Sequence, residues 1–268
     1  MEPHRRRCDA LAAQGAVAAS SPAEVAAAAR TVLVSVADEQ AVEGVLFGSA
    51  GAVAALRPGG VVIEASTTSP EFARTLGSRL QAAGHQLLEA RLLGNAQHAR
   101  QGELRVMTAG PQPVSEAASS LLAELGKEVT HLGDIGAAAA MKLVLNMLMG
   151  IEMQALAEAV LLGEQAGLPR ARVLAAIAAS GFSSPVMRFK CQAMGRGAFS
   201  PPDFRLSLMQ KDMALALAQA RRLNVPVPTA DASGAAFTEA VAMGLGDLDC
   251  AAMLSYMEAV LSAATGSR

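Results

Sequence analysis

Gly133-Asp-Ile-Gly136-Ala-Ala-Ala-Ala-Met-Lys142-Leu-Val-Leu-Asn146 is a short turn between two glycines that leads directly into a long apolar helix. Lys142 and Asn146 are four residues apart, so they share one face of the predicted helix. A lysine among hydrocarbon neighbours either extends its amine to water or lies in a pocket where loss of hydration favours the neutral amine and makes proton transfer near neutral pH feasible. From the residues alone, the first interpretation is favoured.

The same stretch resembles the catalytic helix of the β-hydroxyacid dehydrogenase family, in which a Gly-x-x-Gly turn precedes Lys-x-x-x-Asn. Within that family, Met141-Lys-Leu-Val-Leu-Asn-Met-Leu-Met-Gly150 is most similar to the glyoxylate/succinic semialdehyde reductase branch. Upstream, Glu64-Ala-Ser66-Thr67-Thr68-Ser-Pro70 is similar to the family's substrate-loop segment Asp-Met-Ser-Thr. Downstream, Gln210-Lys211-Asp212 matches a Lys-Asp pair, so the resemblance spans essentially the whole chain.

Composition limits the class of protein. The chain has 268 residues, 52% of them hydrophobic, which is long enough for two domains. A formal net charge of −2 gives no reason to expect nucleic acid or an anionic membrane as partner. Cys8, Cys191 and Cys250 lack Cys-x-x-Cys spacing, so we expect no disulfide framework and no metal site. The apolar run 141–149 is too short to span a bilayer, and residues 1–7 lack an apolar signal segment. We therefore expect a cytoplasmic protein.

The first half of the chain alternates β-branched apolar runs with helical patterns, which is typical of a parallel sheet covered by helices. Ser69 and Pro70 open one of these helices as N-cap and first helical residue. The expected strands are 31–36, 60–64, 85–90 and 104–108, and one helix is expected at 113–125. After Gly136 the strand signal ends. The helices expected there are 137–163, 169–179, 183–194, 208–223, 229–243 and 250–263.

These patterns and the resemblance predict an α/β fold: an N-terminally incomplete, Rossmann-like parallel-sheet domain, a long interdomain helix and an all-α domain. We place the NAD(P)-binding domain at 1–134 and the helical C-terminal dehydrogenase domain at 135–268. Dinucleotide-binding domains normally begin with a strand, a Gly-x-Gly-x-x-Gly turn and a helix whose N-terminus binds pyrophosphate. The chain has no such motif. Against the family pattern, one strand-turn-helix-strand unit of roughly 30 residues is missing. A misplaced start, a shortened chain or a protein that no longer binds dinucleotide would each explain this.

The resemblance also implies where the cofactor would bind. Arg5 and Arg6 follow the point where the second family strand would end, a place where basic residues accompany an adenosine 2′-phosphate. We therefore expect NADP(H) in preference to NAD(H), with a solvated charge cluster as an equally weighted alternative. The other candidate cofactor contacts are Val36, Ala37, Thr67 and Lys211.

Two segments are candidates for binding the acid end of a substrate. Ser66 and Thr67 follow a strand, at the edge where α/β sheets bind ligands, and the resemblance places such hydroxyls against a carboxylate and the nicotinamide ribose. Alternatively, they only cap the next helix. The second segment is Arg91-Leu-Leu93-Gly94-Asn95, where the family has Pro-Val-Ser-Gly-Gly or Pro-Val-Ser-Gly-Ser. Gly94 and Asn95 remain candidates, but leucine replaces serine, a loss on the order of 1–3 kcal/mol if a carboxylate depended on that donor. Arg91 is a substitute donor, although a solvent-facing arginine is the favoured interpretation.

Three residues of the second half complete the candidate site. Lys211 and Asp212 match the family's Lys-Asp pair. Because adjacent residues point in different directions on a helix, we expect at most one to reach a given ligand, and surface solvation of both is the alternative. Phe204 resembles an aromatic residue of the reductase branch's substrate pocket, with core packing as an equal alternative.

The predicted function is an NAD(P)H-dependent reductase of a small aldehyde acid such as glyoxylate or succinic semialdehyde, or oxidation of a β- or γ-hydroxy acid in the reverse direction. Lys142 would donate a proton to the carbonyl oxygen as hydride is delivered. Asn146 would orient the lysine or bind the same oxygen. We expect a homodimer or homotetramer, because the segment from Leu143 to Leu162 is apolar on more faces than one domain can cover.

Two other functions stay open. A catalytically inactive family member could use its helical half for dimerisation or as a scaffold, which the missing glycine-rich turn, Leu93 and Arg91 favour and the intact Lys142 and Asn146 pair disfavours. An imine reductase is ranked lower, because that neighbouring group usually has an acid or tyrosine in place of Lys142.

Overall fold

The computed structural model describes residues 8–266, so the expected cofactor contacts Arg5 and Arg6 lie outside the described residues. The chain divides into two compact units. One, here called the sheet unit, comprises Met1–Leu93 and Arg105–Ala138. The other, the helical unit, comprises Gly94–Leu104 and Ala139–Arg268.

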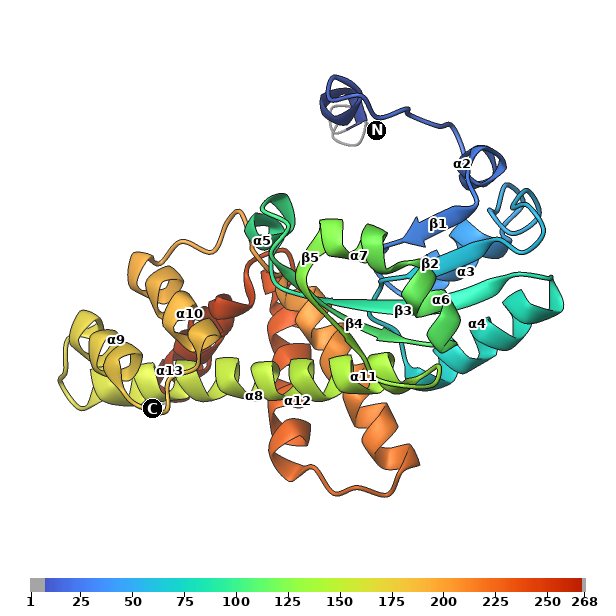
Figure 1. Cartoon of the computed structure of the whole chain (residues 1–268). Coiled ribbons are helices and arrows are strands. Elements are labelled where there is room, and N and C mark those ends of the chain that lie inside the picture. The colour runs from blue at the N-terminus through green and yellow to red at the C-terminus, as the bar shows by residue number, and fades with distance from the viewer. Residues whose placement is uncertain (1–7, 267–268) are drawn as a thin grey trace. The chain divides into compact units, whose positions relative to one another are not determined.

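A five-stranded sheet forms the first unit, with its strands in the order β1-β2-β3-β4-β5 (Figure 1). The strands are β1 (Thr31–Val34), β2 (Val61–Glu64), β3 (Gln86–Leu93), β4 (Leu104–Ala109) and β5 (Gly126–His131). The expected parallel arrangement is confirmed for β1, β2 and β3. By contrast, β4 runs antiparallel to β3. The link between these two strands holds only the short helix α5 (Ala96–Arg100), and a parallel crossover needs about a dozen residues or more.

Helices cover both faces of this sheet because successive strand side chains point to opposite sides. On one face, Val62 and Leu87 join a core with α2 (Pro22–Ala28), α3 (Glu39–Phe47) and α4 (Pro70–Ala82). On the other face, Ile63 and Leu88 pack with α6 (Gln112–Ala117) and α7 (Ser119–Leu125). The result is the three-layer α/β arrangement that the alternating pattern predicts.

Two local features of this unit differ from expectation. The helix predicted at 113–125 is two helices, α6 and α7, which meet at Ala118. Strand β5 was not predicted, because most of its side chains are exposed and its sequence Gly-Lys-Glu-Val-Thr-His lacks an apolar run. In the sheet, β5 is hydrogen-bonded to β4. The N-cap at Ser69 is confirmed, since its side chain accepts a hydrogen bond from Phe72 N–H.

The Gly-x-x-Gly turn requires glycine at both ends. Gly133 and Gly136 have φ angles of +108° and +101°, a left-handed region that other residues adopt with strain. A side chain at Gly136 would also meet the Pro70 carbonyl at 3.3 Å and the Arg74 guanidinium. The turn therefore brings the chain close to the start of α4 before α8 begins.

Long helices make up the second unit. They are α8 (Ala137–Gln165), α9 (Arg170–Ala179), α10 (Pro185–Arg196), α11 (Leu206–Arg222), α12 (Pro228–Ala240) and α13 (Met253–Gly266), with a π-helical turn at Val241–Leu245 and a 3-10 turn at Cys250–Ala252. Each helix predicted after Gly136 is present, with shifted ends. Gly150 lies against Met209 and Met213, so α8 and α11 approach closely.

Helix α8 is long and apolar enough to cross a membrane by length and composition, although the shorter run 141–149 had suggested otherwise. About half of the relevant 18-residue window, 44%, is buried within the protein. The core helix of a soluble protein meets the same two criteria, so this is weak evidence for a membrane span.

Candidate active site

The predicted catalytic residues of α8 meet a buried carboxylate of α11 within the helical unit. Asn146 and Asp212 are 3% and 2% exposed, and the Asn146 Nδ2 donates to Asp212 Oδ2 at 2.5 Å. Lys211 Nζ lies 3.0 Å from the other carboxylate oxygen. Lys142 is partly buried, and its charge acts on the same carboxylate. The structure thus brings together four of the predicted site residues.

Two expectations about this cluster change. Surface solvation of both members of the Lys-Asp pair is wrong, because Asp212 is buried. Adjacent residues of a helix do point their side chains in different directions. Even so, the long side chain of Lys211 bends back so that its ammonium reaches the carboxylate of Asp212. The amide of Asn146 bonds to Asp212, a partner that its spacing from Lys142 did not indicate.

Burial raises the pKa of the Asp212 carboxyl above its ordinary value of 3.8, against the opposing effects of Lys211, Lys142 and the Asn146 hydrogen bond. A carboxyl whose folded-state pKa is raised contributes stability below its unfolded pKa and loses it as pH rises through the folded value. Asp212→Asn, which keeps an acceptor for Asn146, should therefore unfold at a higher temperature than the wild type at neutral pH.

Thermal unfolding of both proteins between pH 3 and pH 8 checks this expectation. The difference should shrink as pH falls toward 3.8, because the unfolded-state carboxyl then also becomes protonated. A less stable Asp212→Asn protein at neutral pH would show that attraction to the two lysines outweighs burial.

In the sheet unit, candidate ligand-binding residues lie at the carboxyl ends of two parallel strands. Val34 of β1 pairs with Glu64 of β2, so the segments that follow these strands lie side by side. Val36 N–H donates to the Ser66 Oγ at 3.0 Å. Ser66 is 3% exposed, and a hydroxyl that accepts one hydrogen bond retains a proton to donate. Ligands bind at this edge of α/β sheets.

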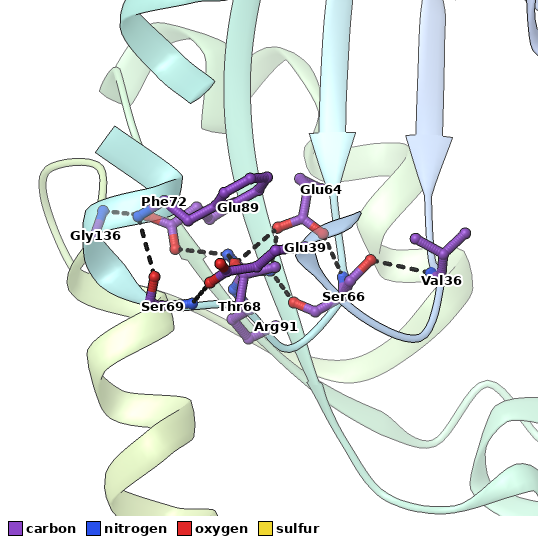
Figure 2. A network of polar contacts seen from close by, with 10 residues as sticks. All are labelled: Val36, Glu39, Glu64, Ser66, Thr68, Ser69, Phe72, Glu89, Arg91 and Gly136. Carbon is purple, nitrogen blue, oxygen red and sulfur yellow. Dashed lines mark hydrogen bonds and ion pairs between the residues drawn. The ribbon is translucent and has the colours of Figure 1, made fainter. Parts of the chain in front are cut away.

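A buried arginine lies beside these residues. Arg91 is completely buried, with its guanidinium between Glu64 and Glu89 (Figure 2). The expectation of a solvent-facing arginine is wrong, because helices cover both faces of the sheet and every residue of β3 from Leu87 to Arg91 is buried. Nor is its charge available to replace the donor lost at Leu93, since two carboxylates already surround it. The sequence held a signal for this cluster: charged residues inside apolar strands need buried partners.

The remaining substrate candidates have local structural roles as well. Gly94 has a φ of +132°. The next residue, Asn95, caps α5: its side-chain Oδ1 accepts hydrogen bonds from the Gln97 and His98 N–H groups at 3.0 and 3.2 Å. Phe204 is partly buried against the core of the helical unit. Its N–H donates to Asp249 Oδ2 at 3.2 Å.

The predicted dinucleotide contacts Val36, Ala37 and Thr67 lie, with Ser66, in the segments that follow β1 and β2, at the edge of the sheet where α/β proteins bind ligands. The Val36 N–H and both backbone groups of Ser66 already have hydrogen-bond partners within the protein. For the pyrophosphate, residues 8–266 contain no Gly-x-Gly-x-x-Gly turn at a helix N-terminus.

Comparisons with known proteins match both halves of the chain to dehydrogenase families. Residues 1–133 match the family model of the NAD binding domain of 6-phosphogluconate dehydrogenase. Residues 136–257 match that of the NAD-binding domain of NADP-dependent 3-hydroxyisobutyrate dehydrogenase. A crystal structure of 3-hydroxyisobutyrate dehydrogenase from Salmonella typhimurium has a TM-score of 0.87 and 28% identity, covering 93% of this chain and 87% of that one.

Two curated relatives differ in length and in name. The chain is 32% identical to glyoxylate/succinic semialdehyde reductase 1 of Arabidopsis thaliana over 94% of its own length and 87% of the relative's. It is 34% identical to the cytokine-like nuclear factor N-PAC of Xenopus tropicalis over 92% of its length, but spans only 46% of that protein. With both halves matched, the chain belongs to the β-hydroxyacid dehydrogenase family of NAD(P)-dependent oxidoreductases.

Proposed function

We propose that the chain reduces a small aldehyde acid of the glyoxylate or succinic semialdehyde type with NAD(P)H, or oxidises a β- or γ-hydroxy acid in reverse. The observation that supports this most is the cluster in the helical unit, where Asn146 is hydrogen-bonded to the buried Asp212 and the positive charge of Lys142 attracts the Asp212 carboxylate. The Arabidopsis relative is named for the same substrates. NADP(H) is the proposed coenzyme.

The proton chemistry follows from this cluster. A bound nicotinamide supplies hydride, and the protein supplies position and a proton. Lys142 donates that proton to the substrate oxygen, where negative charge develops. Burial favours the neutral form of the Asp212 carboxyl, whereas Lys211 and Lys142 favour its charged form. Asn146 fixes Asp212 in place through its amide.

The other candidate residues bind and orient. We assign the acid end of the substrate to Ser66, Thr67, Gly94 and Asn95, with Phe204 and Asp212 as further substrate contacts. The candidate cofactor contacts remain Arg5, Arg6, Val36, Ala37, Thr67 and Lys211. Homodimers or homotetramers are proposed because Val144, Leu148 and Leu162 of α8 are 55%, 55% and 73% exposed in one chain. We propose a cytoplasmic location.

Turnover assays test the function. Glyoxylate, succinic semialdehyde and 3-hydroxyisobutyrate are each offered with NADPH or NADP⁺, and with the corresponding NAD forms. The 268-residue chain is assayed beside the same chain preceded by a strand, glycine-rich turn, helix and strand. We expect the extended form to turn over an aldehyde acid. The shorter form should bind NADPH more weakly, because residues 8–266 hold no glycine-rich turn at a helix N-terminus for the pyrophosphate. Absence of turnover in both forms would contradict the proposal.

One observation favours a second function. The relative N-PAC is named as a nuclear factor, and it matches this chain over 92% of its length. A catalytically inactive dimerisation or scaffold module is therefore the alternative. It predicts oligomers by light scattering and no turnover in either form, whereas a monomer at micromolar concentration would exclude the scaffold.

A further inference from the structure

The pairing of β2 with β3 places two carboxylates opposite each other inside the sheet unit. Glu64 and Glu89 are partners in the parallel register, and both are completely buried. Two like charges directly opposite each other in a sheet are destabilising, and burial increases that cost. A buried cation is required beside them, and Arg91, on the same face of β3, provides it.

The guanidinium does more than balance charge. Its Nη1 donates to the Glu64 carboxylate and to the Ser66 carbonyl, while Nη2 donates to the Thr68 hydroxyl at 2.9 Å and to Glu89 at 3.2 Å. Figure 2 shows these contacts converging on one side chain from β2, β3 and the segment after β2. A planar fork with five N–H donors can serve four acceptors at once, which a lysine ammonium cannot do in the same geometry.

Hydrogen bonds to the N–H and to the carbonyl of Ser66 consequently fix the segment that follows β2. The Ser66 N–H donates to Glu64 Oε1 at 2.6 Å, and its carbonyl accepts from Arg91. The end of the segment is tied to α3, where Ser69 N–H donates to Glu39 at 2.7 Å. Thr67 lies between these fixed points, partly exposed, so its position follows from theirs.

The same cluster includes the turn that precedes α8. Glu89 accepts a hydrogen bond from the Gly136 N–H with one oxygen and from Arg91 with the other. All these groups belong to the sheet unit. Loss of the guanidinium would therefore release the Ser66–Thr68 segment and weaken the support of the Gly136 turn together.

We propose that Arg91 is a positioning residue that holds Ser66, Thr67 and Thr68 in one ligand-binding conformation through its two Nη groups. Its importance for substrate binding rests on the proposed function, whereas the fixing of the segment does not. Arg91 touches no substrate. It acts through the backbone of Ser66 and the hydroxyl of Thr68.

Hydrogen exchange of the full chain tests the proposal without turnover. Arg91→Lys keeps the charge and loses the fork. The triple variant Arg91→Met, Glu64→Gln, Glu89→Gln also loses the fork, and it leaves no charged side chain in this cluster. It therefore allows the test to be made even if Arg91→Met alone fails to fold. The matched control is Arg105→Lys, the same substitution at an exposed arginine of β4 in the sheet unit, where the guanidinium pairs with the exposed Glu128 carboxylate at 3.1 Å.

We expect the Ser66 and Thr68 amides to exchange about tenfold faster or more in both fork-deficient proteins, with α4 and β4 unchanged. The Arg105→Lys control should exchange like the wild type at both amides. Wild-type exchange in Arg91→Lys would overturn the proposal, because a positive charge alone would then suffice. Wild-type exchange in the triple variant would overturn it as well, because the segment would hold its conformation without the guanidinium.

Substrate kinetics separate this proposal from the function it serves. In a form that turns over, both fork-deficient proteins should show a KM for the aldehyde acid raised about tenfold, with a smaller change in kcat, since the segment binds the acid end and does not supply the proton. Faster exchange of the Ser66 and Thr68 amides with an unchanged KM would show that Ser66 and Thr67 do not bind the substrate. The positioning role of Arg91 would still be supported.

Discussion

Lys142→Ala is expected to lower kcat by about a hundredfold or more, the range for loss of a general acid, while NADPH affinity stays almost unchanged. The physical reason is that the variant removes the proton source beside Asp212 and leaves the cofactor contacts in place. Steady-state kinetics with glyoxylate and succinic semialdehyde measure kcat, and isothermal titration measures NADPH affinity, both in a form that turns over.

Two further variants of the cluster make this test specific. Lys142→Arg should not restore activity, because a guanidinium stays protonated in proteins and gives up its proton poorly. Asn146→Ala should cost less than Lys142→Ala, because it removes a hydrogen bond to Asp212 and not the proton source. Equal kcat values for wild type and Lys142→Ala would overturn the catalytic assignment and leave the lysine as a helix residue that extends to water.

Lys190→Met is expected to lower the free energy of unfolding by about 3–5 kcal/mol, the usual cost of leaving one member of a buried ion pair alone. The Lys190 ammonium lies 2.8 Å from both oxygens of Asp249, and both side chains are 4% exposed. Asp249 also accepts from the Asp203 and Phe204 N–H groups, so the loop that holds Phe204 should loosen with it. Urea denaturation monitored by circular dichroism gives the free energy.

The matched control is Arg221→Met, which breaks an exposed ion pair with Asp231 in the same unit, at 3.5 Å and with side chains 74% and 53% exposed. Its expected effect is about 0–1 kcal/mol. A Lys190→Met protein as stable as this control would show that the buried pair contributes no more than a surface pair.

Acid conditions provide a second check on the same pair. Burial acts to raise the pKa of the Asp249 carboxyl, but Lys190 and the backbone N–H donors outweigh it, so the pKa lies below 3.8. A carboxyl with a lowered folded-state pKa contributes stability above its unfolded value and loses it as pH falls through the folded value. The stability difference between wild type and Lys190→Met should therefore narrow below pH 3.8.

Much of the fold follows from local sequence patterns. The long helix through Lys142 and Asn146, the Ser69 cap and the change from alternating elements to helices at Gly136 were all predicted and are present. Each depends on neighbours within a few residues, through 3.6-residue periodicity, side-chain to backbone capping or glycine at positive φ. The four-residue spacing of Lys142 and Asn146 also predicted that they share one helix face, without knowledge of any other segment.

The partners of the functional residues depend on segments far apart in the chain. Asn146 and Asp212 are 66 positions apart and meet because α8 and α11 pack closely at Gly150. Arg91 looked like a surface residue in its own segment, yet the register of β2 and β3 encloses it between two carboxylates. The sequence by itself determined most of the helices and strands and the two residues on one helix face, since these depend on short-range geometry, and its motifs indicated the family. Only tertiary structure decided which charges are buried together, because strand register and helix packing select partners that no local spacing encodes.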